Sequence, residues 1–247
     1  MGATRIEFRL RVAIMVIVIW LGFWAPWIER WGLGWRIPLL EWLPLELSRL
    51  GFARFSVASP AVIVLGALIA AVGVVLRIWG TAYLGPGTVN HGEMKAGAVL
   101  ADGPYRYVRN PLYVGSWCMM AAMACLMPPT GALFSMTLLT VFFLRLILGE
   151  EAFLAGRLGE PYLEYLRAVP RLFPSLRASL PPAGHKPNWL VSMVSELNPI
   201  GVFITLAALS WSYNYQLMVK AIIISFGVSL VARALFVGKT AEAQAAA

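Results

Sequence analysis

Apolar residues form long, uninterrupted runs along this chain instead of recurring at one face of a helix or strand. A helix surrounded by lipid needs apolar side chains on every face, so such runs predict membrane-spanning helices. We therefore expect an all-α fold, namely a polytopic integral membrane bundle of about six transmembrane helices. The expected spans are residues 12–27, 60–83, 112–127, 131–148, 199–213 and 217–237.

The polar segments between these runs divide the chain into three expected parts. Residues 1–59 hold a first span and a Trp- and Leu-rich stretch, 35–50, that is typical of an interfacial amphipathic helix. Residues 60–187 form a membrane core, which ends in a Pro-rich segment, 170–187, interpreted as a linker. Residues 188–247 supply two further spans and a tail.

Composition supports the membrane class and narrows the set of partners. Hydrophobic residues make up 60% of the chain and charged residues 13%, whereas soluble domains are roughly 45–50% apolar. The net charge is +8, but the basic residues flank apolar runs, a pattern that suits anionic lipid headgroups rather than nucleic acid. With basic loops at 84–111 and 149–188 inside, both termini are expected in the cytoplasm.

Cysteine and histidine give no support for a disulfide or a metal site. Cys118 and Cys125 lie seven positions apart, which on one helix is roughly 10 Å, too far for a disulfide. His91 and His185 are far apart and lack ligand spacing, so we expect no metal.

The segment 102–115 carries the first candidate chemistry. Asn110 is a favoured N-cap residue, and Pro111 suits the first position of a helix. A helix N-terminus next to Arg109 favours an anion such as a carboxylate or phosphate. The alternative is that Arg106 and Arg109 only anchor the helix to headgroups, within an aromatic belt.

A second candidate is the acidic pair Glu150 and Glu151, expected just after the fourth span. Two acids at a helix C-terminus oppose the helix dipole, which suggests a compensating cation or ligand. The alternative is that both carboxylates are solvated or paired with Arg145, Arg157 or Arg171.

Several short motifs follow one another in a characteristic order across this region. They are Gly103-Pro104-Tyr105, Arg109-Asn110-Pro111-Leu112-Tyr113-Val114-Gly115, Glu150-Glu151, Tyr162-X-X-Tyr165 and Val169-Pro170-Arg171-Leu172-Phe173-Pro174. Over about residues 73–177 the chain resembles the isoprenylcysteine carboxyl methyltransferase and phospholipid N-methyltransferase superfamily. One departure is Asn110, where many members carry histidine. Asparagine can cap a helix but cannot accept a proton.

The resemblance implies an S-adenosylmethionine-dependent methyltransferase with a cytoplasmic cofactor pocket. The cofactor-binding residues it implies are Tyr105, Arg109, Asn110, Pro111, Tyr113, Gly115, Glu150 and Glu151. The cofactor's carboxylate would lie near Arg109 and Asn110, and its positive charge near Glu150 or Glu151. Tyr105 and Tyr113 would enclose the adenine.

Three residues are candidates for acting on the substrate. Glu151 is expected to serve as a base for an amine, and Arg171 to orient a carboxylate or phosphate, unless Arg171 is a structural partner of the acids. His91 is a further candidate base, with a simply solvated loop histidine as its alternative. The substrate is expected to be a lipid or a membrane-partitioning carboxylate, thiol or amine.

Two rival functions remain open at this point. Membrane sterol reductases resemble the C-terminal half of this core and would use NADPH for hydride transfer. A non-enzymatic transporter or scaffold would use Arg77, Arg145 and Arg233 as polar contacts within the membrane. The sequence does not indicate the oligomeric state.

Overall fold

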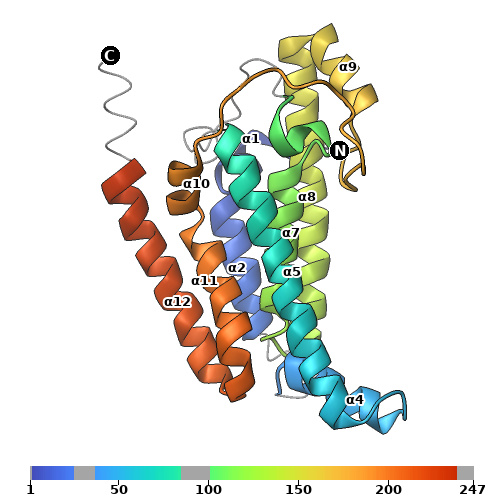
Figure 1. Ribbon diagram of the computed structural model, residues 1–247, viewed down its shortest axis with the longest axis vertical. Coiled ribbons are helices and arrows are strands. Elements are labelled where there is room, and N and C mark those ends of the chain that lie inside the picture. Colours follow the sequence, from blue (N-terminus) through green and yellow to red (C-terminus); the bar gives the residue numbers. More distant parts are fainter. Residues whose placement is uncertain (1, 25–36, 85–100, 238–247) are drawn as a thin grey trace.

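The computed structural model describes residues 2–24, 37–84 and 101–237, and in these ranges the chain is helical and has no strand (Figure 1). The α-helices are α1 (Arg5–Arg9), α2 (Arg11–Phe23), α4 (Leu39–Arg49), α5 (Phe55–Leu84), α7 (Pro111–Ala124), α8 (Pro129–Leu158), α9 (Glu160–Ala168), α10 (Trp189–Ser195), α11 (Leu197–Ile204) and α12 (Tyr215–Ala232). Shorter turns of helix are η1 (Gly103–Arg106), η2 (Thr205–Leu209), η3 (Ser210–Ser212) and η4 (Arg233–Val237). The all-α prediction is confirmed.

Three described helices are long and apolar enough to cross a membrane. They are α5, α8 and the continuous helix Tyr215–Phe236, which joins α12 to η4. The pair Trp189–Ser195 and Leu197–Ser212 passes the same test when taken together, but it bends by 65° at the break, as a broken span or a re-entrant loop does. Helix α2 is apolar but shorter. These helices make the chain a membrane protein.

The long helices stand side by side and pack through small residues (Figure 1). Helices α5 and α7 cross where Gly73 meets Gly115, so that a Cβ atom on Gly73 would lie 3.0 Å from the carbonyl oxygen of Gly115. Helices α2 and α8 cross at Gly22 and Gly131, which approach so closely that a Cβ atom on Gly131 would clash with the carbonyl of Gly22. Close approach at small residues is the usual packing of helices in lipid.

The amphipathic helix expected in 35–50 is present as α4, although residues 35 and 36 lie outside the described part. It lies at the end of the bundle opposite α9 (Figure 1) and buries Leu40. The amide of Leu40 donates to the carbonyl of Cys125, and that of Leu39 to the carbonyl of Met127. Helix α4 is thereby fixed to the turn between α7 and α8.

The C-terminal end of helix α8 differs from the sequence-based expectation, and this changes the surroundings of Glu150 and Glu151. Helix α8 does not end at Leu148 but continues to Leu158, because Gly149 and Gly156 keep a helical backbone and the first residue with a positive φ, +66°, is Gly159. Glu150 and Glu151 therefore lie inside a helix and not at its C-terminus. Their compensation must come from neighbouring side chains, because the helix dipole acts mainly on the last turn.

The Pro-rich segment 170–187 is more than a linker. It runs across one end of the bundle as a strap, passing over η1 (Figure 1). Its backbone bonds directly to this region: Arg109 donates to the carbonyl of Pro170, Ser175 to that of Tyr107 and Ser179 to that of Arg106. The strap thus forms one side of the region that contains the candidate chemistry.

Candidate active site

Glu151 is the centre of a buried charged cluster at the strap end of the bundle. Its side chain is 7% exposed, and its Oε2 lies 2.9 Å from a terminal nitrogen of Arg171. Asn110 donates from Nδ2 to Oε1 over 3.2 Å. The Nε atom of Arg109 lies 3.4 Å from the same Oε1. One carboxylate thus joins helix α8, the start of α7 and the strap.

Local sequence explains how these groups reach Glu151. Asn110 is at the N-cap of α7 and Pro111 is the first helical residue, as predicted. The Asn110 side chain, however, makes no capping bond; its Nδ2 bonds instead to Glu151 and to the carbonyl of Arg171. The N–H groups in the first turn of α7 are therefore not occupied by their own N-cap side chain.

Glu150 has a different hydrogen-bond partner from Glu151, namely Tyr113 of helix α7. The hydroxyl of Tyr113 donates to Oε2 of Glu150 over 2.9 Å, and the ring of Tyr113 packs edge-on against Phe143 at 6.0 Å. The positive charge of Arg11, on α2, also acts on Glu150. The two adjacent acids thus have different partners and different electrostatic surroundings.

Three tyrosines, Tyr105, Tyr162 and Tyr165, form a layer of tyrosines in the same region. The rings of Tyr162 and Tyr165 are buried and lie 5.8 Å apart at a tilt of 37°, and the hydroxyl of Tyr165 donates to the carbonyl of Tyr105. Burial raises the pKa of Tyr162, and the negative charges of Glu151 and Glu150 add to the effect. Burial likewise raises the pKa of Tyr105, with Tyr165 as a further cause. These phenols stay protonated at neutral pH and can only be neutral hydrogen-bonding groups.

Two buried polar atoms of this region have no hydrogen-bond partner within the described residues. One is the hydroxyl oxygen of Tyr105, and the other is Nε of Arg109. The second lies close enough to Glu151 for an ion pair but lacks hydrogen-bond geometry. Buried polar atoms without partners are uncommon in native proteins, so both atoms are available to a bound polar molecule.

The net charge of the cluster indicates which chemical groups of a ligand it can bind. Arg109 and Arg171 together carry two positive charges, and Glu151 carries one negative charge. The remaining positive charge and the start of α7 both favour a carboxylate or phosphate. Glu150, which stands apart from the two arginines, is better placed to favour a cation. The residues present therefore fit a molecule with both an anionic and a cationic group.

The structure brings most of the predicted site residues together. Arg109, Asn110, Glu151 and Arg171 form the cluster, while Tyr113 and Glu150 form the adjoining pair. Tyr105 lies within electrostatic reach of Glu150. Gly115 lies farther along α7, against Arg77 of α5. His91 lies outside the described residues.

Sequence reasoning missed three contributors near the site. Arg11 belongs to the basic N-terminal stretch and carried no motif signal. The charges of four site residues act on Tyr162, and the Tyr-X-X-Tyr motif was a usable signal for it. Asp102 accepts from the backbone amides of Ala183, Gly184 and His185, and from the His185 ring at 2.6 Å. This last group anchors the strap to the start of η1.

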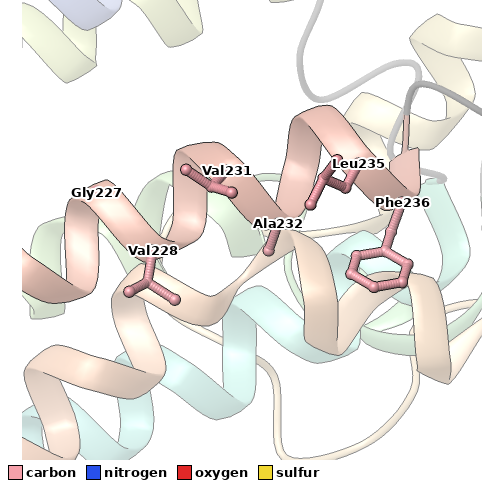
Figure 2. A pocket seen from close by; sticks show the side chains of 6 residues that line it. All are labelled: Gly227, Val228, Val231, Ala232, Leu235 and Phe236. Atoms are coloured by element: carbon pink, nitrogen blue, oxygen red, sulfur yellow. The ribbon is translucent and has the colours of Figure 1, made fainter.

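A hollow on α12 and η4 is a different kind of surface. It is lined by apolar groups alone, from Gly227, Val228, Val231, Ala232, Leu235 and Phe236 (Figure 2). None of these side chains can take part in acid–base or charge chemistry. The hollow is apolar and is not the candidate active site.

A bundle of apolar helices with a polar cluster at one end defines a helical membrane protein with a candidate active site at that end. Residues 61–160 match the sequence model of the phospholipid methyltransferase family. This match, which covers less than half of the chain, confirms the resemblance to the isoprenylcysteine carboxyl methyltransferase and phospholipid N-methyltransferase superfamily over this segment. Comparison with curated proteins and with solved structures gives no match for this chain.

The matched segment includes most of α5 and all of η1, α7 and α8. It therefore contains every residue of the cluster except Arg171, which the strap supplies. Helices α2 and α10 to α12 lie outside the match.

Proposed function

We propose that this protein is an S-adenosylmethionine-dependent methyltransferase that acts on a lipid or another membrane-partitioning molecule. One observation supports this proposal above the others: Glu151 contacts residues of two other sequence motifs. Arg109 and Asn110 belong to the motif at the start of α7, and Arg171 belongs to the motif at the start of the strap. The segments are distant in sequence, yet they converge on one acidic residue at the end of an apolar bundle. Such a convergence supports a site built jointly by the motifs.

The charges of the site suggest how the cofactor would be held. S-adenosylmethionine, when bound, supplies a methyl group activated by a positively charged sulfur. Arg109, Arg171 and the start of α7 would bind its carboxylate, because together they retain positive charge after pairing with Glu151. Glu150 would balance its positive charges, and Tyr105 and Tyr113 would enclose the adenine.

Methyl transfer needs few acidic or basic catalytic groups from the protein. The main tasks are to align the nucleophile with the methyl group and to exclude water, to which the strap and the tyrosine layer would contribute. A carboxylate or thiolate acceptor needs no base. For an amine acceptor, Glu150 is better suited than Glu151, because both oxygens of Glu151 already contact cations or the Asn110 amide. His91, which lies outside the described residues, stays a candidate base.

The membrane arrangement belongs to the same proposal. We infer that α2 and α7 also cross, partly or tilted, which with the spans above gives the six transmembrane helices expected from the sequence. The strap end, with its basic residues, would face the cytoplasm together with both termini. The division at residues 59 and 187 would separate an N-terminal part, a methyltransferase core and a C-terminal pair of spans.

The decisive experiment is calorimetric titration of the full chain, purified in nanodiscs, with S-adenosylmethionine and S-adenosylhomocysteine. We expect saturable binding of both, and at least a tenfold loss in Glu151→Gln and Arg109→Ala, since each change disrupts the charge balance of the cluster. The matched control is Arg157→Gln, an exposed arginine on the same helix as Glu151, which should bind like the wild type.

Each rival function has its own outcome in this experiment. Binding of NADPH in place of the sulfur compounds would identify a reductase. Binding of none of them would favour a transporter or scaffold, although the three arginines of that hypothesis all have protein contacts: Arg77 with Glu196, Arg145 with Glu7, and Arg233 with the carbonyl of Ser195. Unchanged binding in both site variants would refute the pocket assignment while leaving the family intact.

A further inference from the structure

A buried ion pair joins the C-terminal helices to the core. Glu196, at the break between α10 and α11, has a side chain that is fully buried. Arg77 of α5 donates to both oxygens of this carboxylate, from Nε over 2.6 Å and from a terminal nitrogen over 3.0 Å. Thr81, about one turn farther along α5, donates to the same carboxylate over 2.8 Å. Glu196 therefore holds the guanidinium of Arg77 in one orientation.

The remaining terminal nitrogen of Arg77 contacts α7. It donates to the hydroxyl oxygen of Ser116 over 2.6 Å, and Ser116 in turn donates to the carbonyl of Leu112, in the first turn of that helix. Gly115 makes this contact possible, because a Cβ atom at its position would lie only 2.7 Å from Cγ of Arg77. The glycine that ends this sequence motif thus leaves room for the arginine of the ion pair.

The same turns of α7 carry residues of the candidate active site. Asn110, at the N-cap, donates to Glu151. Tyr113, in the first turn, donates to Glu150. Ser116 follows Tyr113 by three positions, which is about one helical turn. A displacement of α7 at Ser116 would therefore also move the phenol that binds Glu150.

The ion pair also lies close to Tyr105, whose buried hydroxyl oxygen has no hydrogen-bond partner within the described residues. Gly80 lies about one turn after Arg77 on α5, and a Cβ atom on it would lie 3.5 Å from that oxygen. The charges of Arg77 and Glu196 act on Tyr105, as does the charge of Glu150. The ion pair and the candidate active site therefore share Tyr105 as a neighbour.

We propose that Glu196 is a positioning residue of the candidate active site. It acts through Arg77 and Ser116, which together fix the first two turns of α7 against α5. Glu196 belongs to helices outside the family match, whereas Arg77 and Ser116 lie within the match. The matched core is therefore incomplete without the C-terminal helices. The effect of Glu196 on cofactor binding rests on the proposed function, whereas its effect on α7 does not.

The first measurement is hydrogen exchange of the purified full chain in nanodiscs, which needs no ligand. Glu196→Gln should speed exchange about tenfold at the backbone amides of residues 114–118, because α7 is held less firmly. Arg233→Met is the matched control. Arg233 donates to the carbonyl of Ser195, next to Glu196, and makes no hydrogen bond or salt bridge to α5 or α7 within the described residues. This control should speed exchange near the bend between α10 and α11 and leave residues 114–118 unchanged.

The second measurement is calorimetric titration with S-adenosylhomocysteine, well below the melting temperature of each variant. Ser116→Ala removes the hydroxyl that links Arg77 to α7 and should lower the affinity about two- to tenfold, which corresponds to one hydrogen bond. Ser116→Thr keeps the hydroxyl and should restore the affinity. If Glu196 acts through this link, Glu196→Gln combined with Ser116→Ala should bind no more weakly than Glu196→Gln alone.

Three outcomes would overturn the proposal. The first is unchanged exchange at residues 114–118 in Glu196→Gln, or in Ser116→Ala if the glutamate variant does not fold. The second is equally fast exchange there in Arg233→Met, which would show a general loosening caused by the C-terminal helices. The third is additive loss of affinity in the double variant. A wild type that binds no S-adenosylhomocysteine would refute the proposed function, and the exchange rates would still decide whether Glu196 positions α7.

Discussion

Tyr113 of helix α7 and Glu150 of helix α8 form a 2.9 Å hydrogen bond, which links the two helices. The bond sets the orientation of one acid of the pair, while the neighbouring Glu151 is held by arginines and an asparagine. Two adjacent carboxylates therefore present different chemistry: one is neutralised by cations and the other is bound by a neutral phenol.

Removing this hydrogen bond gives the first prediction. Tyr113→Phe keeps the ring packing against Phe143 but frees Glu150. Because one net hydrogen bond contributes roughly 0.5–1.5 kcal/mol, we expect the affinity for S-adenosylhomocysteine to fall about two- to tenfold. Calorimetry measures the change. Tyr107→Phe is the matched control, since the ring of Tyr107 contacts Trp79 and its hydroxyl makes no hydrogen bond to any described residue. Equal affinities in the two variants would place Glu150 outside the pocket.

The ion pair between Arg77 and Glu196 gives the second prediction. Glu196→Gln leaves Arg77 buried with a weaker partner, and breaking a buried pair costs about 3–5 kcal/mol of unfolding free energy. The double variant Arg77→Met with Glu196→Met removes both charges and should be more stable than Glu196→Gln alone. Thermal denaturation in detergent measures both. A double variant as unstable as the sum of the single variants Arg77→Met and Glu196→Met would show that the two residues act independently.

The strap should respond to acid through Asp102. Burial tends to raise the pKa of this carboxyl, but the hydrogen bonds from His185, Ala183 and Gly184 outweigh it and hold the pKa below its ordinary 3.8. Since the folded-state pKa is the lower one, the carboxylate stabilises the fold above about pH 4, and this contribution is lost as the pH falls through the folded-state value.

We therefore expect the amides of residues 183–185 to lose protection from hydrogen exchange below pH 4, after correction for intrinsic rates. Amides in the middle of α8 serve as the internal reference. In Asp102→Asn the protection should already be low at neutral pH and should no longer depend on acid. Protection that is independent of pH in the wild type would contradict the assigned role of Asp102.

The crossing of α2 and α8 gives a prediction about folding alone. Gly131→Ala places a Cβ atom against the carbonyl of Gly22 and should destabilise the protein by roughly 1–3 kcal/mol. Gly156→Ala, in the same helix, meets nothing within 4 Å and should be neutral or slightly stabilising. The melting temperatures of the two variants compare them directly. A tolerated Gly131→Ala would mean that α2 can shift away from α8 at little cost.

Local sequence signals predicted the helices and the motif positions well. Apolar runs located α5, α8 and α12, and Asn-Pro located the start of α7, because these features depend on neighbouring residues only. The pairing of Arg171 with Glu151 was foreseen as an alternative to a direct role on the substrate. The length of α8 was underestimated, because the end of an apolar run is not the end of a helix.

Contacts between segments that are far apart along the chain could not be predicted from the sequence. Arg77 and Glu196 are separated by 119 positions, and Asp102 and His185 by 83. Nothing in the residues around each member specifies its partner, because the pairing follows from how the helices pack. The same holds for Arg11, whose charge acts on Glu150 because α2 packs against α8.

The strap also determines how the protein would respond to cleavage of its backbone. Leu176 is fully exposed and Arg177 is exposed, so a trypsin cut after Arg177 meets an accessible peptide bond. Beyond the cut, the bonds from Ser179 to Arg106 and from His185 to Asp102, and the pair of Glu196 with Arg77, would still hold the C-terminal fragment. The protein is therefore suited to production as two separately translated halves that reassemble in the membrane.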